Sequence, residues 1–297
     1  MLWFLQSRCN YDCPYCSYTD SRNLRAGFLK QEKHYSIGQW SDAWRSFYEK
    51  HGMADIYISG AGEPTLYPDF TGLLKELGRW HRVIFDTNLS WPQAALERFA
   101  AEIDAAKVRV ETSFHPTGGA DPEVFTAKAA FLREKGFTLN CRLVAHPPCF
   151  EKIDEYRACF KSKNLPFVLT PFSGHFNGKV YPDEYTPEEK RMILSAAEGE
   201  AGDPIRSKQP ELVRHLVEQS AESPFGKLCR AGYQYGCIMP DASVYRCQEY
   251  GMQGWETLGN FFDKDFKLND SATVCRSTVC GIGYRWLVEE TARFAND

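Results

Sequence analysis

The sequence has no long apolar run, no excess of positive charge and no tract of low complexity. Nowhere in its 297 residues does an apolar stretch approach the roughly 18 residues that cross a bilayer, so we expect no membrane span. The net charge of −4 gives no electrostatic reason to expect nucleic acid or an anionic membrane as a partner. The opening MLWFLQSR is too short for a secretory signal and lacks its basic region. We therefore expect a cytoplasmic protein.

Cysteine, by contrast, is abundant. Apolar residues make up 43% and charged residues 25% of the chain, as in globular proteins, yet it carries eleven cysteines. Three lie between positions 9 and 16 and five between 229 and 280. Because cytoplasmic thiols stay reduced, such clusters indicate metal binding or catalysis rather than disulfides.

Residues 1–172 alternate short β-rich runs with longer amphipathic segments. This alternation predicts parallel strands wrapped by helices. A complete eight-fold barrel needs about 250 residues, so the fold class expected is α/β, a partial (β/α)6 TIM-like barrel. The predicted strands are 2–7, 55–60, 82–87, 107–114, 138–145 and 166–172. The predicted helices are 36–51 with Ser36 as cap, a segment near 69–80, 91–105, 122–136 and 151–163.

The composition changes after the predicted barrel. Residues 173–228 are rich in Gly, Pro and aromatics at first and then predict helices around 187–199 and 209–221. We interpret them as a helical linker. Residues 229–297 are rich in Cys and Gly and contain short β-like segments. This composition predicts a small domain that a metal site holds together.

The first cysteine cluster has the spacing C-x3-C-x2-C, at Cys9, Cys13 and Cys16. Such spacing suits zinc or an iron–sulfur cluster. A structural zinc site requires four protein ligands, and no fourth Cys or His lies within residues 1–33. Three ligands on a 4Fe–4S cube leave one iron free to bind another molecule. The loop also follows the first predicted strand, at the barrel end where active sites lie.

This motif, with Tyr15 before its last cysteine, resembles that of the radical S-adenosylmethionine (SAM) superfamily. The resemblance implies that Cys9, Cys13 and Cys16 hold a 4Fe–4S cluster whose unique iron chelates SAM, and that Tyr15 contributes to SAM binding. One electron then cleaves SAM to methionine and a 5′-deoxyadenosyl radical. An electron donor such as flavodoxin or ferredoxin is the implied partner.

Two further loops resemble motifs of the same family. After the second predicted strand, GAGEP resembles a Gly-Gly-Glu-Pro loop with alanine as its second residue, which implies that Gly60, Gly62 and Glu63 bind the SAM ammonium. After the third strand, DTNLS resembles Thr-Asn-Gly and implies a role for Asn88, with Leu89 in place of glycine. A plain turn is the alternative for each loop.

Strand alternation predicts which polar side chains face the barrel interior. In the fourth and fifth strands, Glu111, Ser113, Asn140 and Arg142 alternate with apolar residues and should point inward. The resemblance implies that Ser113 and Arg142 hold the SAM ribose and carboxylate, and the planar guanidinium suits a carboxylate. The alternative is a structural ion pair between Arg142 and Glu111.

The C-terminal cysteines resemble the auxiliary-cluster extensions called SPASM and, in their one-cluster form, twitch. Cys229-x12-Ala242-x4-Cys247 matches their spacing, with Ala242 in place of glycine. Because only five cysteines lie here, twitch fits better than SPASM. The resemblance implies that Cys229, Cys247, Cys275 and Cys280 hold an auxiliary 4Fe–4S cluster. A zinc ribbon is the alternative, since four thiolates also satisfy zinc.

Two remaining cysteines are candidate hydrogen donors to a substrate radical. Cys237 lies within the C-terminal cluster and Cys149 follows the fifth strand. The alternative for Cys237 is a ligand or a small buried hydrophobe. His115, His146 and His175 follow successive predicted strands, which indicates a polar substrate pocket over the SAM site.

We therefore expect a radical SAM enzyme that abstracts hydrogen from a C–H bond of a small polar substrate, sugar-like or from natural product biosynthesis. The outcome would be oxidation, as by an oxidoreductase, or epimerisation, as by an epimerase. Because the first strand is predicted to begin at residue 2, we expect no upstream peptide-recognition domain. A maturase of ribosomal peptides is the alternative. A zinc-stabilised binding protein without catalysis is an alternative of a different class.

Overall fold

The computed structural model describes most of the chain. The ranges described are 1–16, 32–197, 213–214, 217–218 and 223–280. The helix predicted at 209–221 therefore lies largely outside the described residues. Within them, no helix is long and apolar enough to cross a membrane.

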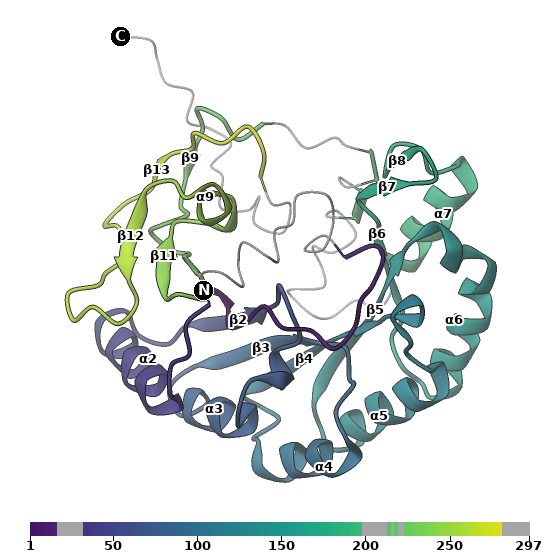
Figure 1. The fold of residues 1–297 in the computed structure, drawn as a ribbon, viewed down its shortest axis with the longest axis horizontal. Helices are drawn as coiled ribbons and strands as arrows, with labels where there is room; N and C mark the ends of the chain where they lie inside the picture. The colour runs from purple at the N-terminus through teal and green to yellow at the C-terminus, as the bar shows by residue number, and fades with distance from the viewer. Residues whose placement is uncertain (17–31, 198–212, 215–216, 219–222, 281–297) are drawn as a thin grey trace.

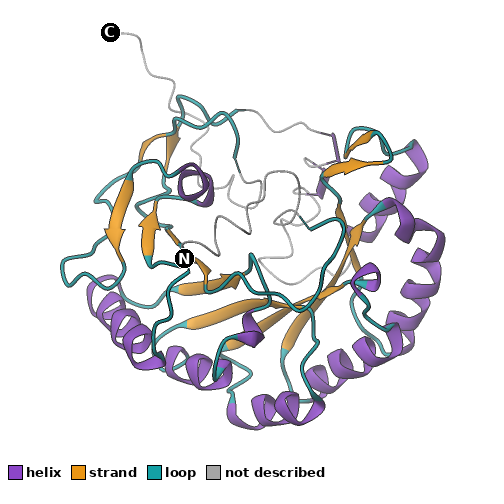
Figure 2. Ribbon diagram, in the orientation of Figure 1, coloured by secondary structure: helices purple, strands orange, loops and turns teal. Residues whose placement is uncertain are grey.

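Six parallel strands form a curved sheet whose order follows the chain. They are β1 (Leu2–Phe4), β2 (Asp55–Ser59), β3 (Arg82–Thr87), β4 (Val108–Phe114), β5 (Thr138–Ala145) and β6 (Val168–Pro171). Six helices follow them in turn and cover the convex side of the sheet (Figures 1 and 2). These are α2 (Ile37–His51), α3 (Phe70–Leu77), α4 (Gln93–Glu102), α5 (Pro122–Glu134), α6 (Ile153–Ser162) and α7 (Pro187–Ala197). The predicted α/β fold, a partial (β/α)6 barrel, is confirmed.

Side-chain caps account for where several helices begin. The Ser36 hydroxyl accepts from the Gln39 amide and the Gln39 side chain accepts from the Ser36 amide, which forms a capping box at α2. Asp69 caps α3 and Asp121 caps α5 in the same general way. Each cap satisfies amide groups that the first helical turn leaves without a partner.

Short segments complete the strand ends where the site lies. The 3-10 turns η1 (Pro64–Leu66), η2 (Pro116–Gly118) and η3 (Pro147–Lys152) follow β2, β4 and β5. A hairpin of β7 (Gly174–Phe176) and β8 (Lys179–Tyr181), which the sequence did not predict, follows β6. Helix α7, which falls in the segment predicted to be a linker, packs against β6 and supplies the sixth β–α unit.

The C-terminal segment extends the barrel sheet beyond β1. Strand β10 (Cys237–Ile238) pairs in parallel with β1, and β11 (Ser243–Tyr245) and β12 (Thr257–Asn260) continue the sheet in antiparallel fashion. A separate ribbon joins β9 (Leu228–Cys229) to β13 (Thr273–Val274), and α9 (Gln248–Gln253) lies beside it (Figure 1). Strand β1, which leads to the first cysteines, and strand β10, which carries Cys237, therefore lie side by side in one sheet.

Strand β1 lies between two apolar clusters. Trp3, which is fully buried, packs with Trp40 and Trp44 of α2 in the main core. Its neighbours Leu2 and Phe4 point to the other side and pack in a second cluster with C-terminal residues. This alternation follows from the two-residue period of a strand.

Candidate active site

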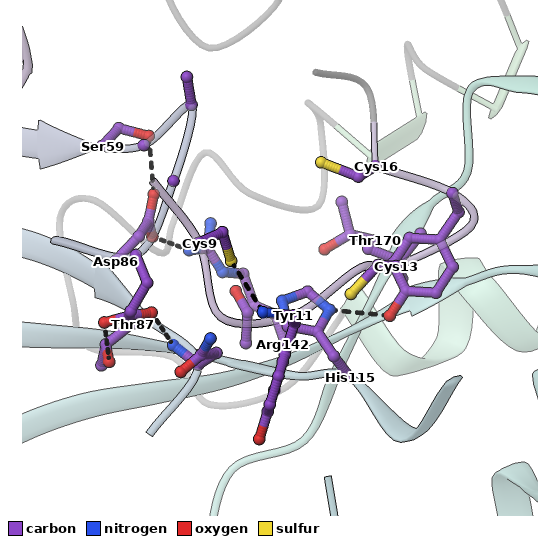
Figure 3. Close-up of a pocket in the computed structure, with 18 residues that line it drawn as sticks. Cys9, Tyr11, Cys13, Cys16, Ser59, Asp86, Thr87, His115, Arg142 and Thr170 are labelled. Atoms are coloured by element: carbon purple, nitrogen blue, oxygen red, sulfur yellow. Dashed lines mark hydrogen bonds and ion pairs between the residues drawn. The ribbon is translucent and has the colours of Figure 1, made fainter. Parts of the chain in front are cut away.

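A cavity of about 300 Å³ opens at the carboxyl ends of the barrel strands (Figure 3). Every residue that the resemblance assigned to the SAM site lines it. These are Cys9, Cys13, Tyr15, Cys16, Gly60, Gly62, Glu63, Asn88, Ser113 and Arg142. They come from loops after β1, β2 and β3 and from β4 and β5, because parallel strands bring their carboxyl ends to one edge.

The first three cysteines form a compact loop after β1. The Cys16 amide donates to the Cys13 carbonyl at 3.0 Å, and the Tyr11 amide donates to the Cys9 sulfur at 3.4 Å. Burial, with the neighbouring Cys16 and Cys9, raises the pKa of the Cys13 thiol to about 12. Holding such thiols together as thiolates therefore requires a cation among them.

The arrangement of thiols fits a cluster better than one ion. Among the described residues, no three Cys, His, Asp or Glu side chains converge on a position for a single metal ion. The three cysteines of the loop nevertheless all line the same cavity. In an iron–sulfur cluster each thiolate binds a different iron, so the spread of these sulfurs and the chemistry of the donor set both fit it.

Glycine is required at two positions of the GAGEP loop. A Cβ on Gly62 would lie 2.1 Å from the Arg8 carbonyl oxygen, and one on Gly60 would lie 1.9 Å from the Gly62 carbonyl oxygen. Real Cβ atoms do not approach backbone that closely, so the loop can dock on the chain leading to Cys9 only with glycine there. Ala61, between them, is buried against the second apolar cluster.

Glu63 organises the loops rather than facing the cavity as a free carboxylate. Its oxygens accept from the Thr87 hydroxyl at 2.8 Å, the Asn88 amide at 2.7 Å and the Thr65 amide at 3.3 Å. Burial raises its pKa, and these hydrogen bonds oppose that effect. Asn88 in turn donates through its side chain to Asn10 at 3.0 Å. The loops after β2 and β3 are thus tied to the cysteine loop.

Leu89 explains the departure from the family's Thr-Asn-Gly pattern. Its φ is 53°, in the left-handed region that glycine adopts most easily. Its side chain is buried in the main core. The backbone at this position therefore keeps the conformation that glycine provides, and apolar packing compensates part of the strain.

Arg142 lines the cavity as predicted and is already paired. Its guanidinium contacts Asp86, and its Nε lies 3.9 Å from Glu111. Burial alone would lower the pKa of Arg142. The negative charges of Asp86 and Glu111 raise it by a larger amount, so the pKa lies well above its ordinary value. The alternative of a structural ion pair therefore describes this geometry, with Asp86 as the main partner.

Asp86 is a site residue that the sequence reasoning missed. Tyr57 donates to both its oxygens at 2.9 and 3.0 Å. Ser59 donates to one of them at 2.9 Å (Figure 3). Asp86 shares the inward face of β3 with Ile84, at the carboxyl end of the strand. The same alternation that located Ser113 and Arg142 could have located it.

Two of the three predicted histidines gather around Tyr15. The Tyr15 hydroxyl and His115 Nδ1 are hydrogen-bonded at 2.8 Å, and the Tyr15 ring lies 5.1 Å from that of His146. Burial, with Arg142 adding and Asp86 opposing, lowers the pKa of His115 to about 4. His115 is therefore neutral near pH 7. His175 is exposed on β7 and does not line the cavity.

The two candidate hydrogen donors do not line this cavity. Cys149 is buried in η3, where burial raises its pKa to about 11. Cys237 is fully buried on β10, paired with Leu2, and its sulfur lies 3.9 Å from that of Met239. Burial also raises the pKa of Cys237 well above its ordinary value. Both thiols thus have apolar surroundings.

Three of the four predicted auxiliary cysteines lie in or against the second apolar cluster. Cys229 and Cys275 are buried there, and Cys247 packs against it. The Ala231 amide donates to the Cys229 sulfur at 3.5 Å. Burial, with Cys275 nearby, raises the pKa of Cys247 to about 11. Cys280 is partly exposed at the end of the described residues.

Comparison with known proteins identifies the family. The profile of the Radical SAM superfamily matches residues 3–148. The chain is also 36% identical over 217 residues to a 7-carboxy-7-deazaguanine synthase from Methanothermobacter thermautotrophicus, which covers 64% of this chain and 78% of that protein. The chain belongs to the radical SAM superfamily. It is thus a radical SAM enzyme, and members of this family use SAM and a 4Fe–4S cluster.

Two solved structures resemble this radical SAM enzyme along most of its length. SuiB from Streptococcus suis superposes with a TM-score of 0.58 at 19% identity, over 89% of this chain and 63% of that chain. The enzyme thus spans less than two thirds of SuiB. Native anSMEcpe with bound AdoMet gives 0.58 at 20% identity, over 91% of this chain and 81% of that chain. At these identities the likeness concerns the fold.

Proposed function

We propose that this enzyme cleaves SAM reductively in the cavity and abstracts hydrogen from a C–H bond of a small polar substrate. The observation that carries the proposal is the convergence of the three cysteines and the GAGEP loop on one cavity. When bound, a 4Fe–4S cluster supplies the electron that splits SAM into methionine and the 5′-deoxyadenosyl radical. Cys9, Cys13 and Cys16 would hold that cluster.

The other residues bind and orient. The close approach at Gly60 and Gly62 leaves room for backbone carbonyls, without side chains, to face a ligand ammonium. Tyr15, held by His115, offers a flat apolar surface beside the cysteines. Ser113 offers a hydroxyl from the inner face of β4. The assignments of Asn88 and Arg142 to SAM have less support, because the Asn88 amide already donates to Glu63 and the Arg142 guanidinium already pairs with Asp86.

A small polar substrate is favoured by the lining of the cavity. Ser59, Asp86 and Thr170 present polar groups from β2, β3 and β6. The relative from Methanothermobacter is named for a small-molecule product. Such groups recognise hydroxyls and amines at defined positions.

A peptide substrate is the second candidate. SuiB has been solved bound to the precursor peptide SuiA, and anSMEcpe with the Cp18Cys peptide. Those structures cover 89% and 91% of this chain, which is more than its barrel.

We infer that Cys229, Cys247, Cys275 and Cys280 hold an auxiliary 4Fe–4S cluster that accepts an electron in an oxidation.

Anaerobically purified protein tests the proposal directly. We expect about eight irons per chain, a brown colour that bleaches with dithionite, and 5′-deoxyadenosine on addition of SAM and dithionite. Colourless protein with stoichiometric zinc would instead support the non-catalytic alternative. Fractions of small metabolites and of peptides, added separately, identify the substrate class by which one stimulates 5′-deoxyadenosine formation.

The thiol-donor assignments need a second experiment. Cys237→Ala and Cys149→Ala are each assayed with substrate in deuterated solvent. A thiol donor exchanges with solvent, so its loss removes deuterium from the product of an epimerisation. If neither substitution changes the deuterium content, both donor assignments fail and oxidation is favoured.

A further inference from the structure

Arg246 is a buried cation beside the C-terminal cysteines. It lies between β11 and α9, directly before Cys247, and is only 4% exposed. Its guanidinium lies over the Tyr250 ring, 5.0 Å from the ring centroid. A buried arginine normally pairs with a carboxylate, because an isolated charge is costly to remove from water.

The partners of Arg246 are main-chain carbonyls of the ribbon that carries the other cysteines. Nη1 donates to the Val274 carbonyl at 2.8 Å, and Nη2 donates to the Thr273 carbonyl at 3.0 Å. Nη2 also lies 3.4 Å from the carbonyl of Cys229 itself. One side chain thus links the residue before Cys247 to Cys229 and to the residues just before Cys275.

The charge of Arg246 is not neutralised by these contacts. In the described part of the chain its hydrogen bonds all go to neutral carbonyls, and its buried Nε has no partner. Arg276, directly after Cys275, is exposed and paired with Glu256. A buried cation that has no carboxylate partner among the described residues and lies beside the C-terminal cysteines fits a group of net negative charge, as a cluster with several thiolate ligands has.

We propose that Arg246 is a positioning residue for the auxiliary cluster, and that its charge raises the reduction potential of that cluster. The inference rests on the proposed function, in that it requires an auxiliary cluster. The planar guanidinium of Arg246 fixes the relative positions of Cys229, Cys247 and Cys275 through its contacts with three carbonyls. The positive charge favours the reduced, more negative state of the cluster.

The experiment isolates the auxiliary cluster in the full chain. The three substitutions Cys9→Ala, Cys13→Ala and Cys16→Ala remove the first cluster, and iron content and a redox titration followed by electron paramagnetic resonance report on the second. In this background we compare Arg246→Gln, which removes the charge, with Arg246→Lys, which keeps it. Arg276→Gln is the matched control, since it removes an exposed, paired arginine next to Cys275.

We expect Arg246→Gln to lower the ratio of reduced to oxidised cluster at fixed potential at least tenfold, a shift of about 59 mV for one electron, and to lower iron content. Arg246→Lys should lose iron but keep the potential, and Arg276→Gln should change neither. If Arg246→Gln retains no cluster, the loss of iron supports positioning. The charge role is then tested by the cluster that remains in Arg246→Lys, whose potential should equal that of the parent protein, and a lower potential would refute that role.

Two results would overturn the inference. Equal iron content and equal potential in Arg246→Gln and Arg276→Gln would refute both roles while leaving the auxiliary cluster intact. Absence of iron from the background protein would refute the auxiliary cluster itself, and the inference with it.

Discussion

The two cysteine sets share one local contact and differ in their surroundings. In each, the amide two residues after the first cysteine donates to its sulfur, from Tyr11 to Cys9 and from Ala231 to Cys229. The first set borders an open cavity framed by glycine. The second lies against an apolar cluster, with a buried arginine beside it. We infer that the first is arranged to admit a ligand and the second to exclude one.

Removing one cysteine from each set gives the largest expected difference. Cys13→Ala should reduce 5′-deoxyadenosine formation to the uncatalysed rate, because the cluster that reduces SAM is lost. Cys275→Ala should keep SAM cleavage and lose product. Each should lower iron from about eight to about four per chain. Equal loss of SAM cleavage in both variants would contradict the division of roles.

Gly62→Ala tests the glycine frame of the first site. Its Cβ would meet the Arg8 carbonyl oxygen at 2.1 Å, so we expect a loss of about 2 to 3 kcal/mol in unfolding free energy and weaker SAM binding. Urea unfolding and calorimetry measure these. Gly38→Ala in α2, where a Cβ meets only the Ser36 hydroxyl at 3.8 Å, should change stability by at most about 1 kcal/mol.

Acid should act on the first site more than on the second. No histidine lies between residues 229 and 280, whereas burial lowers the pKa of His115 from 6.5 to about 4. The unfolded chain therefore binds a proton that the folded chain does not between these values. The contribution of neutral His115 to the free energy of unfolding is therefore complete above pH 6.5 and is lost as the pH falls toward 4. This loss amounts to at most about 3 kcal/mol.

His115→Gln should flatten this acid dependence in urea unfolding between pH 7 and 5. His175→Gln, on the exposed strand β7, is the control and should leave the slope unchanged. The same slope in wild type and His115→Gln would show that His115 does not titrate with unfolding.

Ala242→Gly gives the smallest expected effect and concerns the second site. Ala242 has a φ of 67° where the related motif has glycine. Relief of left-handed strain gains about 1 to 2 kcal/mol, while the lost buried methyl costs about 0.8 kcal/mol. We expect a net gain below about 1 kcal/mol in thermal or urea unfolding. A clear loss would mean that packing of the methyl group dominates.

Local periodicity predicted the barrel well. The predicted strand 82–87 and helix 36–51 differ from β3 and α2 by at most one residue, because alternation and the Ser36 cap are encoded in adjacent residues. Pairing of β10 with β1 was not predictable in this way, since it joins residues far apart in the sequence through a two-residue strand. The number of cysteines likewise gave no indication of how Arg246 lies among them.

Strand alternation correctly predicted that Ser113 and Arg142 line the cavity. It did not predict that Asp86 is the main partner of Arg142. The sequence reasoning named Glu111, on the adjoining strand, as the partner in the alternative of an ion pair, whereas Asp86 reaches Arg142 more closely from β3. Which of two carboxylates a guanidinium contacts depends on strand twist and side-chain reach. A pattern of inward and outward residues does not contain that information.

The pairing of β1 bears on how the chain is made. Its backbone bonds to β2 on one edge and to β10 on the other. Because a ribosome makes the chain in sequence order, β2 becomes available to β1 well before β10 does. Throughout that interval the strand leading to the first cysteines keeps an open edge, and Leu2 and Phe4 lack the C-terminal side chains that cover them.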